Sequence, residues 1–108
     1  MQIIDIYGNP CPTLYVLSLI SGKWRLPILL KLDQHQALRF NALKKEIPGI
    51  TNMMLTQCLQ DFEAHQLILR TQYEEIPPHV EYSLTPTGKE LLVLLKQLHE
   101  WGTLHLNV

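Results

Sequence analysis

The sequence predicts an α+β fold in which a helix-turn-helix precedes a β-hairpin and a long final helix. Residues 40–47 have helical spacing, Pro48-Gly49 ends that helix, and a second helix follows within a few residues. Two β-rich runs, at 67–73 and 80–84, flank a segment with two prolines, which is typical of a hairpin tip. A helix-turn-helix followed by such a hairpin is a winged helix-turn-helix.

Length and composition limit the class of protein. The chain has 108 residues, which suits one small domain over residues 1–108, and its 46% hydrophobic and 18% charged content is that of a folded globular chain. It contains no apolar run of about 18 residues that could span a membrane. The first ten residues lack the basic and then apolar order of a secretion signal. We therefore expect a cytoplasmic protein that does not contact a membrane.

The first third of the chain is predicted to be helical after a short arm. Residues 1–10 show no clear period and are expected to form this arm. Pro12 suits the first position of a helix, and Ser21-Gly22 suits its end. A second helix is expected over 23–32, where the apolar residues are almost continuous, followed by a polar loop at 33–36. Such a helix is expected to pack on more than one side.

The helix expected over 51–66 has an apolar side and a polar side. Leu55, Leu59, Phe62 and Gln66 fall within about 40° of Leu55 on a helical wheel. The opposite side carries amides, hydroxyls and a thioether, of which amides and hydroxyls suit hydrogen bonding to base edges in a major groove. An ordinary surface helix would show the same pattern. The candidate DNA-reading residues of this recognition helix are Thr51, Asn52, Met53, Thr56, Gln57 and Gln60.

The charges are segregated along the chain. Residues 22–60 carry six Lys or Arg and two Asp or Glu, which gives a net charge of +4. The rest of the chain carries three Lys or Arg and eight Asp or Glu, which gives a net charge of −5. A basic segment that ends in a candidate recognition helix is expected of a small domain that binds double-stranded DNA. Solvated surface charge would give the same asymmetry. The candidate phosphate contacts in this segment are Lys23, Arg25, Arg39, Lys44 and Lys45.

The last helix, expected over 86–106 after an N-cap at Thr85, has more apolar positions than one packing surface can bury. We expect it to form a homodimer together with the arm and the first helix, and a thicker core is the alternative. One stripe contains Leu91, Leu94, Leu95, Leu98 and Trp101, and other apolar residues lie outside it. The predicted interface residues are Leu92, Val93, Trp101 and Leu104.

The two cysteines are interpreted differently. Neither belongs to a CxxC pair, so neither a zinc site nor a disulfide framework is predicted. Cys11 lies at the start of the first helix, where a thiolate is stabilised, as a redox-sensing thiol requires; the alternative is a small residue buried at the dimer interface. Cys58 lies at the edge of an apolar face and is expected to fill the core. The sequence shows no metal-ligand spacing and no catalytic constellation. We therefore predict that the protein holds no metal or cofactor and is not an enzyme.

Several motifs together resemble the HxlR-type winged-helix transcriptional regulators, which are relatives of the MarR family. Their order and spacing match the family over nearly the whole chain, and the wing motif PPxVEYSLTPxG is the most specific of them. The matching segments are Cys11-Pro12, SGKW at 21–24, ALRF at 37–40, PGIT at 48–51, MLTQCL at 54–59, IPPHVEYSLTPTGKEL at 76–91 and EWG at 100–102.

The resemblance implies a homodimeric bacterial or archaeal regulator, with its recognition helix in the major groove and its wing near the DNA backbone. In some members a cysteine in the place of Cys11 senses oxidants or electrophiles. We therefore expect a sequence-specific transcriptional regulator, acting as a repressor, that responds to an oxidant or a small molecule through a thiol or a ligand site.

Four positions depart from the family pattern. Members often carry Lys near position 53, Arg at 58 and 60, and Arg or Lys at 79, where this chain has Met53, Cys58, Gln60 and His79. His79 is thus the candidate DNA contact of the wing, but without a permanent charge. These losses keep an alternative open, in which a winged-helix dimer binds a protein or a small molecule and has only weak affinity for DNA.

Overall fold

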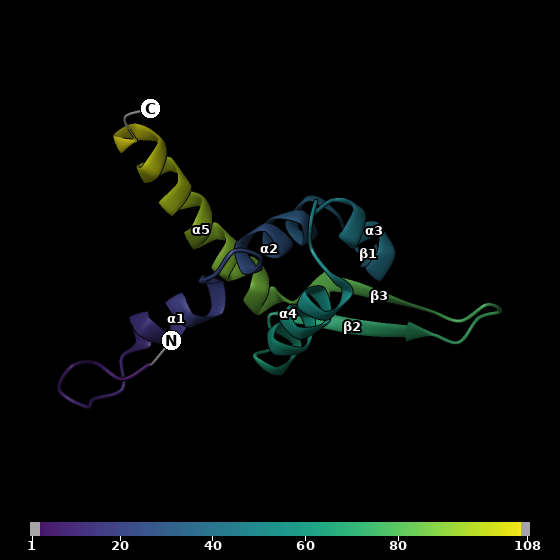
Figure 1. The fold of residues 1–108 in the computed structure, drawn as a ribbon, viewed down its shortest axis with the longest axis horizontal. Helices are drawn as coiled ribbons and strands as arrows, with labels where there is room; N and C mark the ends of the chain where they lie inside the picture. The colour runs from purple at the N-terminus through teal and green to yellow at the C-terminus, as the bar shows by residue number, and fades with distance from the viewer. Residues whose placement is uncertain (1–2, 107–108) are drawn as a thin grey trace.

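The computed structural model describes residues 3–106 and has the predicted architecture. Figure 1 shows a hairpin extending from one side of a helical body, while the first helix and the end of the last helix extend from the other. The α+β winged helix-turn-helix is therefore confirmed. In chain order the elements are α1 (Pro12–Ile20), α2 (Arg25–Gln34), β1 (Leu38–Arg39), α3 (Phe40–Lys45), α4 (Asn52–Ala64), β2 (Ile68–Tyr73), β3 (His79–Leu84) and α5 (Pro86–His105).

The sheet has the strand order β1-β3-β2, and both pairings are antiparallel. Strands β2 and β3 form the predicted hairpin, which pairs continuously from Ile68 opposite Leu84 to Tyr73 opposite His79. Strand β1 was not predicted. It consists of two residues, Leu38 and Arg39, which pair with Tyr82 and Glu81 of β3. Two residues are too few to show a period, so only the pairing with a distant strand defines β1.

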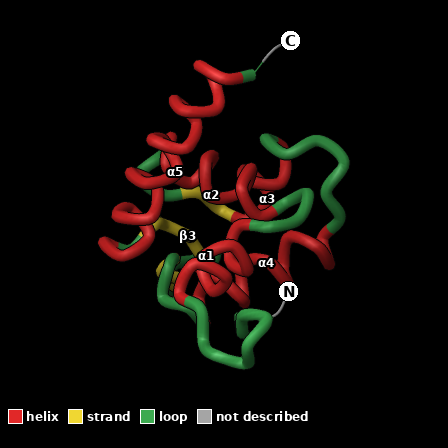
Figure 2. Tube along the Cα trace, turned by 90° about the vertical axis from the view of Figure 1, so that its left-hand side faces the viewer, coloured by secondary structure: helices red, strands yellow, loops and turns green. Residues whose placement is uncertain are grey.

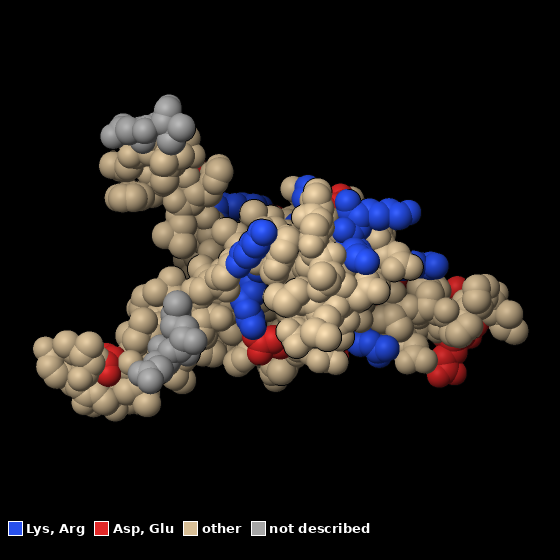
Figure 3. Space-filling view, viewed as in Figure 1, with Lys and Arg blue, Asp and Glu red and all other residues tan. Residues whose placement is uncertain are grey.

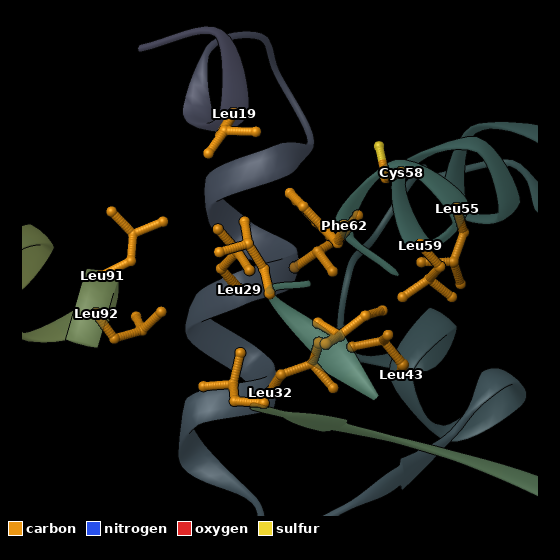
Figure 4. Close-up of a cluster of buried hydrophobic side chains, with 14 of the residues drawn as sticks. Leu19, Leu29, Leu32, Leu43, Leu55, Cys58, Leu59, Phe62, Leu91 and Leu92 are labelled. Atoms are coloured by element: carbon orange, nitrogen blue, oxygen red, sulfur yellow. The ribbon is translucent and has the colours of Figure 1, made fainter. Parts of the chain in front are cut away.

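Helix α2 lies at the centre of the core, as its nearly continuous apolar sequence predicts. Figure 4 shows α4 on one side of it, with Phe62 directed toward Leu29, and α5 on the other side. In the view of Figure 2 the helices lie in front of the small sheet, whose strands are partly visible behind them. The buried core residues are Leu19, Ile28, Leu29, Leu32, Leu43, Ile47, Ile50, Leu55, Cys58, Leu59, Phe62, Leu67, Ile68, Leu84, Leu91, Leu92 and Leu95.

The helix starts follow the local signals in the sequence. The Thr51 hydroxyl accepts a hydrogen bond from the Met54 amide at 3.1 Å, and the Thr85 hydroxyl accepts one from the Gly88 amide at 3.0 Å. Each bond satisfies an amide that the first turn of a helix leaves without a backbone acceptor. Cys11 is the N-cap residue of α1, although its side chain makes no capping hydrogen bond.

Two helix ends differ from the prediction. Helix α2 continues through Asp33 and Gln34, which were expected in a loop, and the Asp33 carboxylate pairs with Lys96 of α5 at 3.0 Å. Helix α4 ends at Ala64, so Gln66 is not part of its apolar stripe. Gln66 has a φ of 61°, which reverses the chain toward β2, and its carbonyl accepts a hydrogen bond from Thr85. In both places a contact with a distant element sets the boundary.

Helix α5 divides its apolar residues between the core and the surface. Leu92 is only 1% exposed and lies in the core of its own chain, so its assignment to the dimer interface was wrong. Gly88, Leu91, Leu92 and Leu95 share an arc of about 100°, which is the side of the helix that packs on the body. Five large apolar residues of α5 remain exposed, namely Val93, Leu94, Leu98, Trp101 and Leu104. Within residues 3–106 no helix is long and apolar enough to span a membrane.

Candidate nucleic-acid interface

Helix α4 exposes the polar face that the sequence predicted. Its opposite face is anchored in the core by Leu55, Leu59 and Phe62, which are at most 2% exposed. Thr51 has a structural role as well, because its hydroxyl caps the helix. The result is an exposed helix face of amides, hydroxyls and a thioether. All six candidate DNA-reading residues are exposed, namely Thr51, Asn52, Met53, Thr56, Gln57 and Gln60.

A short turn, anchored in the core, connects α3 to α4. Ile47 and Ile50 are buried on either side of Pro48-Gly49 and anchor this turn in the core. Gly49 has a φ of 88°, a conformation that residues with a Cβ rarely adopt. The turn therefore fixes the angle between the two helices, which is what a helix-turn-helix needs in order to present its second helix to a groove.

Lys and Arg side chains border the exposed face of α4. In Figure 3 a mostly uncharged surface over α4 lies between basic side chains, with one acidic patch at its lower edge, and further acidic side chains lie toward the end of the hairpin. Lys23, Arg39 and Lys45 are exposed and Lys44 is half-buried. None of these four forms an ion pair within the part of the chain that the structure describes. Their positions suit contacts with phosphates on either side of a groove.

Arg25, which was also predicted to contact phosphate, differs from these four because it is paired within the chain. Its guanidinium donates to the Asp61 carboxylate of α4 and lies 5.8 Å from the Phe62 ring centroid, so its charge is neutralised within the chain. Asp61 is also 3.5 Å from His65, whose ring nitrogen is 3.3 Å from the hydroxyl of Tyr15 in α1. These polar contacts connect α1, α4 and α2, and they place Arg25 among the residues that hold α4 in position.

His79 is likewise occupied within the chain. Its imidazole lies 2.9 Å from the Glu81 carboxylate and 3.5 Å from that of Glu75, and it stacks on Tyr73 with ring centroids 4.7 Å apart. Because side chains alternate along a strand, His79 projects from the face of the hairpin opposite to that of Leu84, which is in the core. This side of the wing is therefore rich in carboxylates, and the assignment of His79 to phosphate binding is not supported.

Sequence reasoning did not select Arg70. This residue lies in β2 and is exposed, and it lines a cleft of about 480 Å³ between α4 and the hairpin. The signal that could have found it is the alternation along the strand, which places Arg70 on the same face as the buried Ile68. The lining residues of this cleft are Thr56, Leu59, Gln60, Glu63, Arg70 and Tyr82.

The two cysteines lie in different environments. Both are free thiols; Cys11 is half-buried at the start of α1, whereas Cys58 is only 5% exposed, as predicted for a core residue. Burial raises the pKa of the Cys58 thiol, and this effect is opposed by Arg25 and assisted by Asp61. Among the described residues, no group of three or more His, Cys, Asp or Glu side chains could hold a metal ion.

Cys11 is expected to react with an alkylating agent before Cys58. The thiolate is the reactive form of cysteine, and the raised pKa of Cys58 keeps that group protonated at neutral pH, while burial blocks access to it. Brief treatment with iodoacetamide at pH 7, followed by peptide mass mapping, should find the label on Cys11 first. Cys58 should react only at higher pH or after unfolding. Equal labelling of both cysteines in the folded chain would contradict this expectation.

The chain combines a helix-turn-helix, a β-hairpin that follows it, an exposed polar face on the second helix, and cations that border this face. This combination defines a winged-helix DNA-binding protein. The chain belongs to the HxlR-like helix-turn-helix family, whose pattern matches residues 19–108. It is thus a transcriptional regulator of the HxlR type, a group related to the MarR regulators.

Individual relatives agree with this assignment. An HTH-type transcriptional regulator of Halalkalibacterium halodurans is 44% identical over 93 residues, covering 86% of this chain and 82% of the relative. The redox regulator HypR in its oxidised form superimposes with a TM-score of 0.78 at 37% identity, covering 91% of this chain and 100% of HypR. The reduced form of the regulator YodB from B. subtilis superimposes with a TM-score of 0.82 at 26% identity, covering 90% of this chain and 95% of YodB.

Proposed function

We propose that this regulator binds a specific double-stranded DNA sequence as a homodimer, with α4 of each protomer in a major groove, and that it represses transcription by occupying that site. The observation that carries the proposal is the uncharged polar face of α4 bordered by Lys and Arg side chains that have no acidic partner among residues 3–106. The amides and hydroxyls of that face can exchange hydrogen bonds with base edges. The cations supply the sequence-independent attraction to phosphate.

The shape of the chain supports a dimer. Its accessible surface is 7862 Å², whereas a compact protein of this mass has about 6,200 Å². Its radius of gyration is 15.5 Å, against about 13 Å for a compact domain of this length. Part of the extra surface lies on the hairpin, and part lies where α1 and the end of α5 extend from the other side of the body (Figure 1). There an apolar groove is lined by Pro12, Thr13, Val16, Leu94, Gln97, Leu98 and Trp101.

Two features support a response to an effector. Cys11 is the half-buried N-cap residue of α1 and directly precedes Pro12 and Thr13, which line this groove, so an oxidant that modified it would act beside the proposed interface. The similarity to HypR, which is a redox regulator, supports a response to an oxidant. A cavity of about 460 Å³ between α2 and α5 has the size of a small-molecule site. Its lining residues are Ile20, Leu26, Leu30, Leu95, Lys96, Leu98 and His99.

One observation favours the alternative, in which the dimer binds a protein or a small molecule with little affinity for DNA. The wing carries Glu74 and Glu75 near its tip, and His79 is held between carboxylates, so this part of the molecule repels phosphate. The two functions differ in the salt dependence of binding to duplex DNA, which is steep only for a protein that neutralises several phosphates.

Variants of Lys45 and Gln57 are expected to separate phosphate attraction from base reading. With four cations per protomer (Lys23, Arg39, Lys44 and Lys45), a dimer neutralises about eight phosphates, and log K should fall with log salt at a slope near −7. Lys45→Ala should reduce that slope by about 2 and weaken binding to all sequences. Gln57→Ala should cost about 1–3 kcal/mol on the preferred site and leave the slope unchanged.

The measurement is fluorescence anisotropy at several salt concentrations, on duplexes selected from the source genome and on duplexes of mixed sequence. If the two variants alter the slope equally and neither changes sequence preference, α4 does not read bases. The alternative function would then be the better account.

A further inference from the structure

The hairpin presents one cation toward the recognition helix. Arg70 lies two residues after Ile68, which is in the core, and is paired in the sheet with Tyr82. Cross-strand partners and alternate residues of a strand share one face. The face that bears Arg70 is therefore the face that packs against the helices, whereas His79 projects from the other face.

Arg70 shares a cleft with two candidate DNA-reading residues. Thr56 and Gln60 of α4 line this cleft of about 480 Å³ together with Arg70. Glu63 also lines it, yet the Arg70 guanidinium forms no ion pair among residues 3–106. Because Arg70 is exposed, its charge is available to a ligand that enters beside α4.

We propose that Arg70 binds a phosphate of the DNA backbone at the edge of the groove that α4 occupies. This inference rests on the proposed function and adds a positioning residue to it. A guanidinium matches a phosphate through two parallel hydrogen bonds, and its origin on the strand beside α4 places it at the edge of the groove. Phosphate contacts set the register of a protein on the duplex. Arg70 therefore sets the position at which Thr56 and Gln60 meet the bases.

The test compares four variants of the full chain on a mixed-sequence duplex long enough for both protomers. With Arg70 as a fifth contact per protomer, the unmodified dimer neutralises about ten phosphates, and its slope should be near −9. Arg70→Gln removes one contact per protomer and should reduce the slope of log K against log salt by about 2, to near −7. Arg70→Lys keeps the charge and should keep the slope. Glu63→Gln removes a carboxylate from the same cleft and should tighten binding. The matched control is Lys89→Gln, which removes an exposed cation from the start of α5 and should change nothing.

Each outcome decides the inference. An unchanged slope in Arg70→Gln, while the unmodified chain binds with a steep salt dependence, would overturn the role of Arg70 and leave the proposed function intact. A changed sequence preference with an unchanged slope would make Arg70 a base reader and overturn the phosphate assignment. Unmodified chain without salt-dependent binding would overturn both proposals. Thermal unfolding shows whether each variant is folded. If Arg70→Gln is unfolded, the DNA affinity of Glu63→Gln tests the inference instead. An unchanged affinity in Glu63→Gln would overturn the role of Arg70.

Discussion

Replacing Leu98 and Trp101 by glutamate is expected to leave a monomer that has lost high-affinity DNA binding. Both side chains are exposed on α5, at 60% and 64%, and line the apolar groove between α1 and α5. Carboxylates that are buried in an apolar interface without partners cost several kcal/mol, which is enough to dissociate a small dimer. The affinity of two linked binding sites exceeds that of a single site by a factor of about 10²–10⁴. The affinity of the monomer for DNA should therefore be lower by at least about a hundredfold.

Light scattering at micromolar concentration should give twice the 12.5 kDa chain mass for the unmodified protein and a single chain mass for the double variant. Leu69→Glu is the matched control, because Leu69 is 55% exposed but lies in β2, away from the groove. It should remain a dimer. A monomeric unmodified chain, or a double variant that is still dimeric, would show that this surface is not the interface.

The second large effect is expected for Gly88→Ala, which should strongly destabilise the fold. A Cβ at Gly88 would lie 2.2 Å from the backbone oxygen of Leu67 and 3.1 Å from its carbonyl carbon. That oxygen also accepts a hydrogen bond from the Thr85 amide at 3.0 Å, so it cannot move without loss. We expect a cost of about 3 kcal/mol or more, which corresponds to a fall in Tm of more than about 10 °C.

Gly102→Ala provides the control within the same helix. Apart from the neighbouring backbone of its own helix, an added Cβ at Gly102 would meet no atom of the described residues within 4 Å. This variant should therefore gain about 0.5–1 kcal/mol from the better helix propensity of alanine. Thermal unfolding should be measured at equal protomer concentrations, because association stabilises the folded chain. Similar Tm values for the two variants would show that the contact between Gly88 and Leu67 is not tight.

The candidate site could be predicted only in part. The exposed face of α4 follows from helical periodicity, since Leu55, Leu59 and Phe62 anchor one side and the polar residues must then lie on the other. The partners of charged residues do not follow from periodicity. Arg25 looked available in the sequence, but the fold brings the Asp61 carboxylate of α4 beside it. His79 contacts Glu75 and Glu81, which lie within four residues of it in the hairpin. Arg70 became visible as a candidate only through the cleft.

The sequence by itself determined those features whose causes lie within a few residues. Thr51 and Thr85 start helices because their hydroxyls bond to amides three residues later. Gly49 allows the turn between α3 and α4, and Pro77-Pro78 lies in the connection between β2 and β3. These are dihedral preferences and local hydrogen bonds, which act in any chain that contains the same short segment.

Only the tertiary structure decided which surfaces meet. It paired β1 with β3, buried Leu92 against the body, and left Leu98 and Trp101 exposed where α5 extends beyond its support. Leu91 and Leu98 are the same residue type on one side of α5, so helical periodicity gives no reason for their opposite environments. The physical reason is that burial and ion pairing depend on elements distant in the chain, whose approach is set by the packing of the whole core.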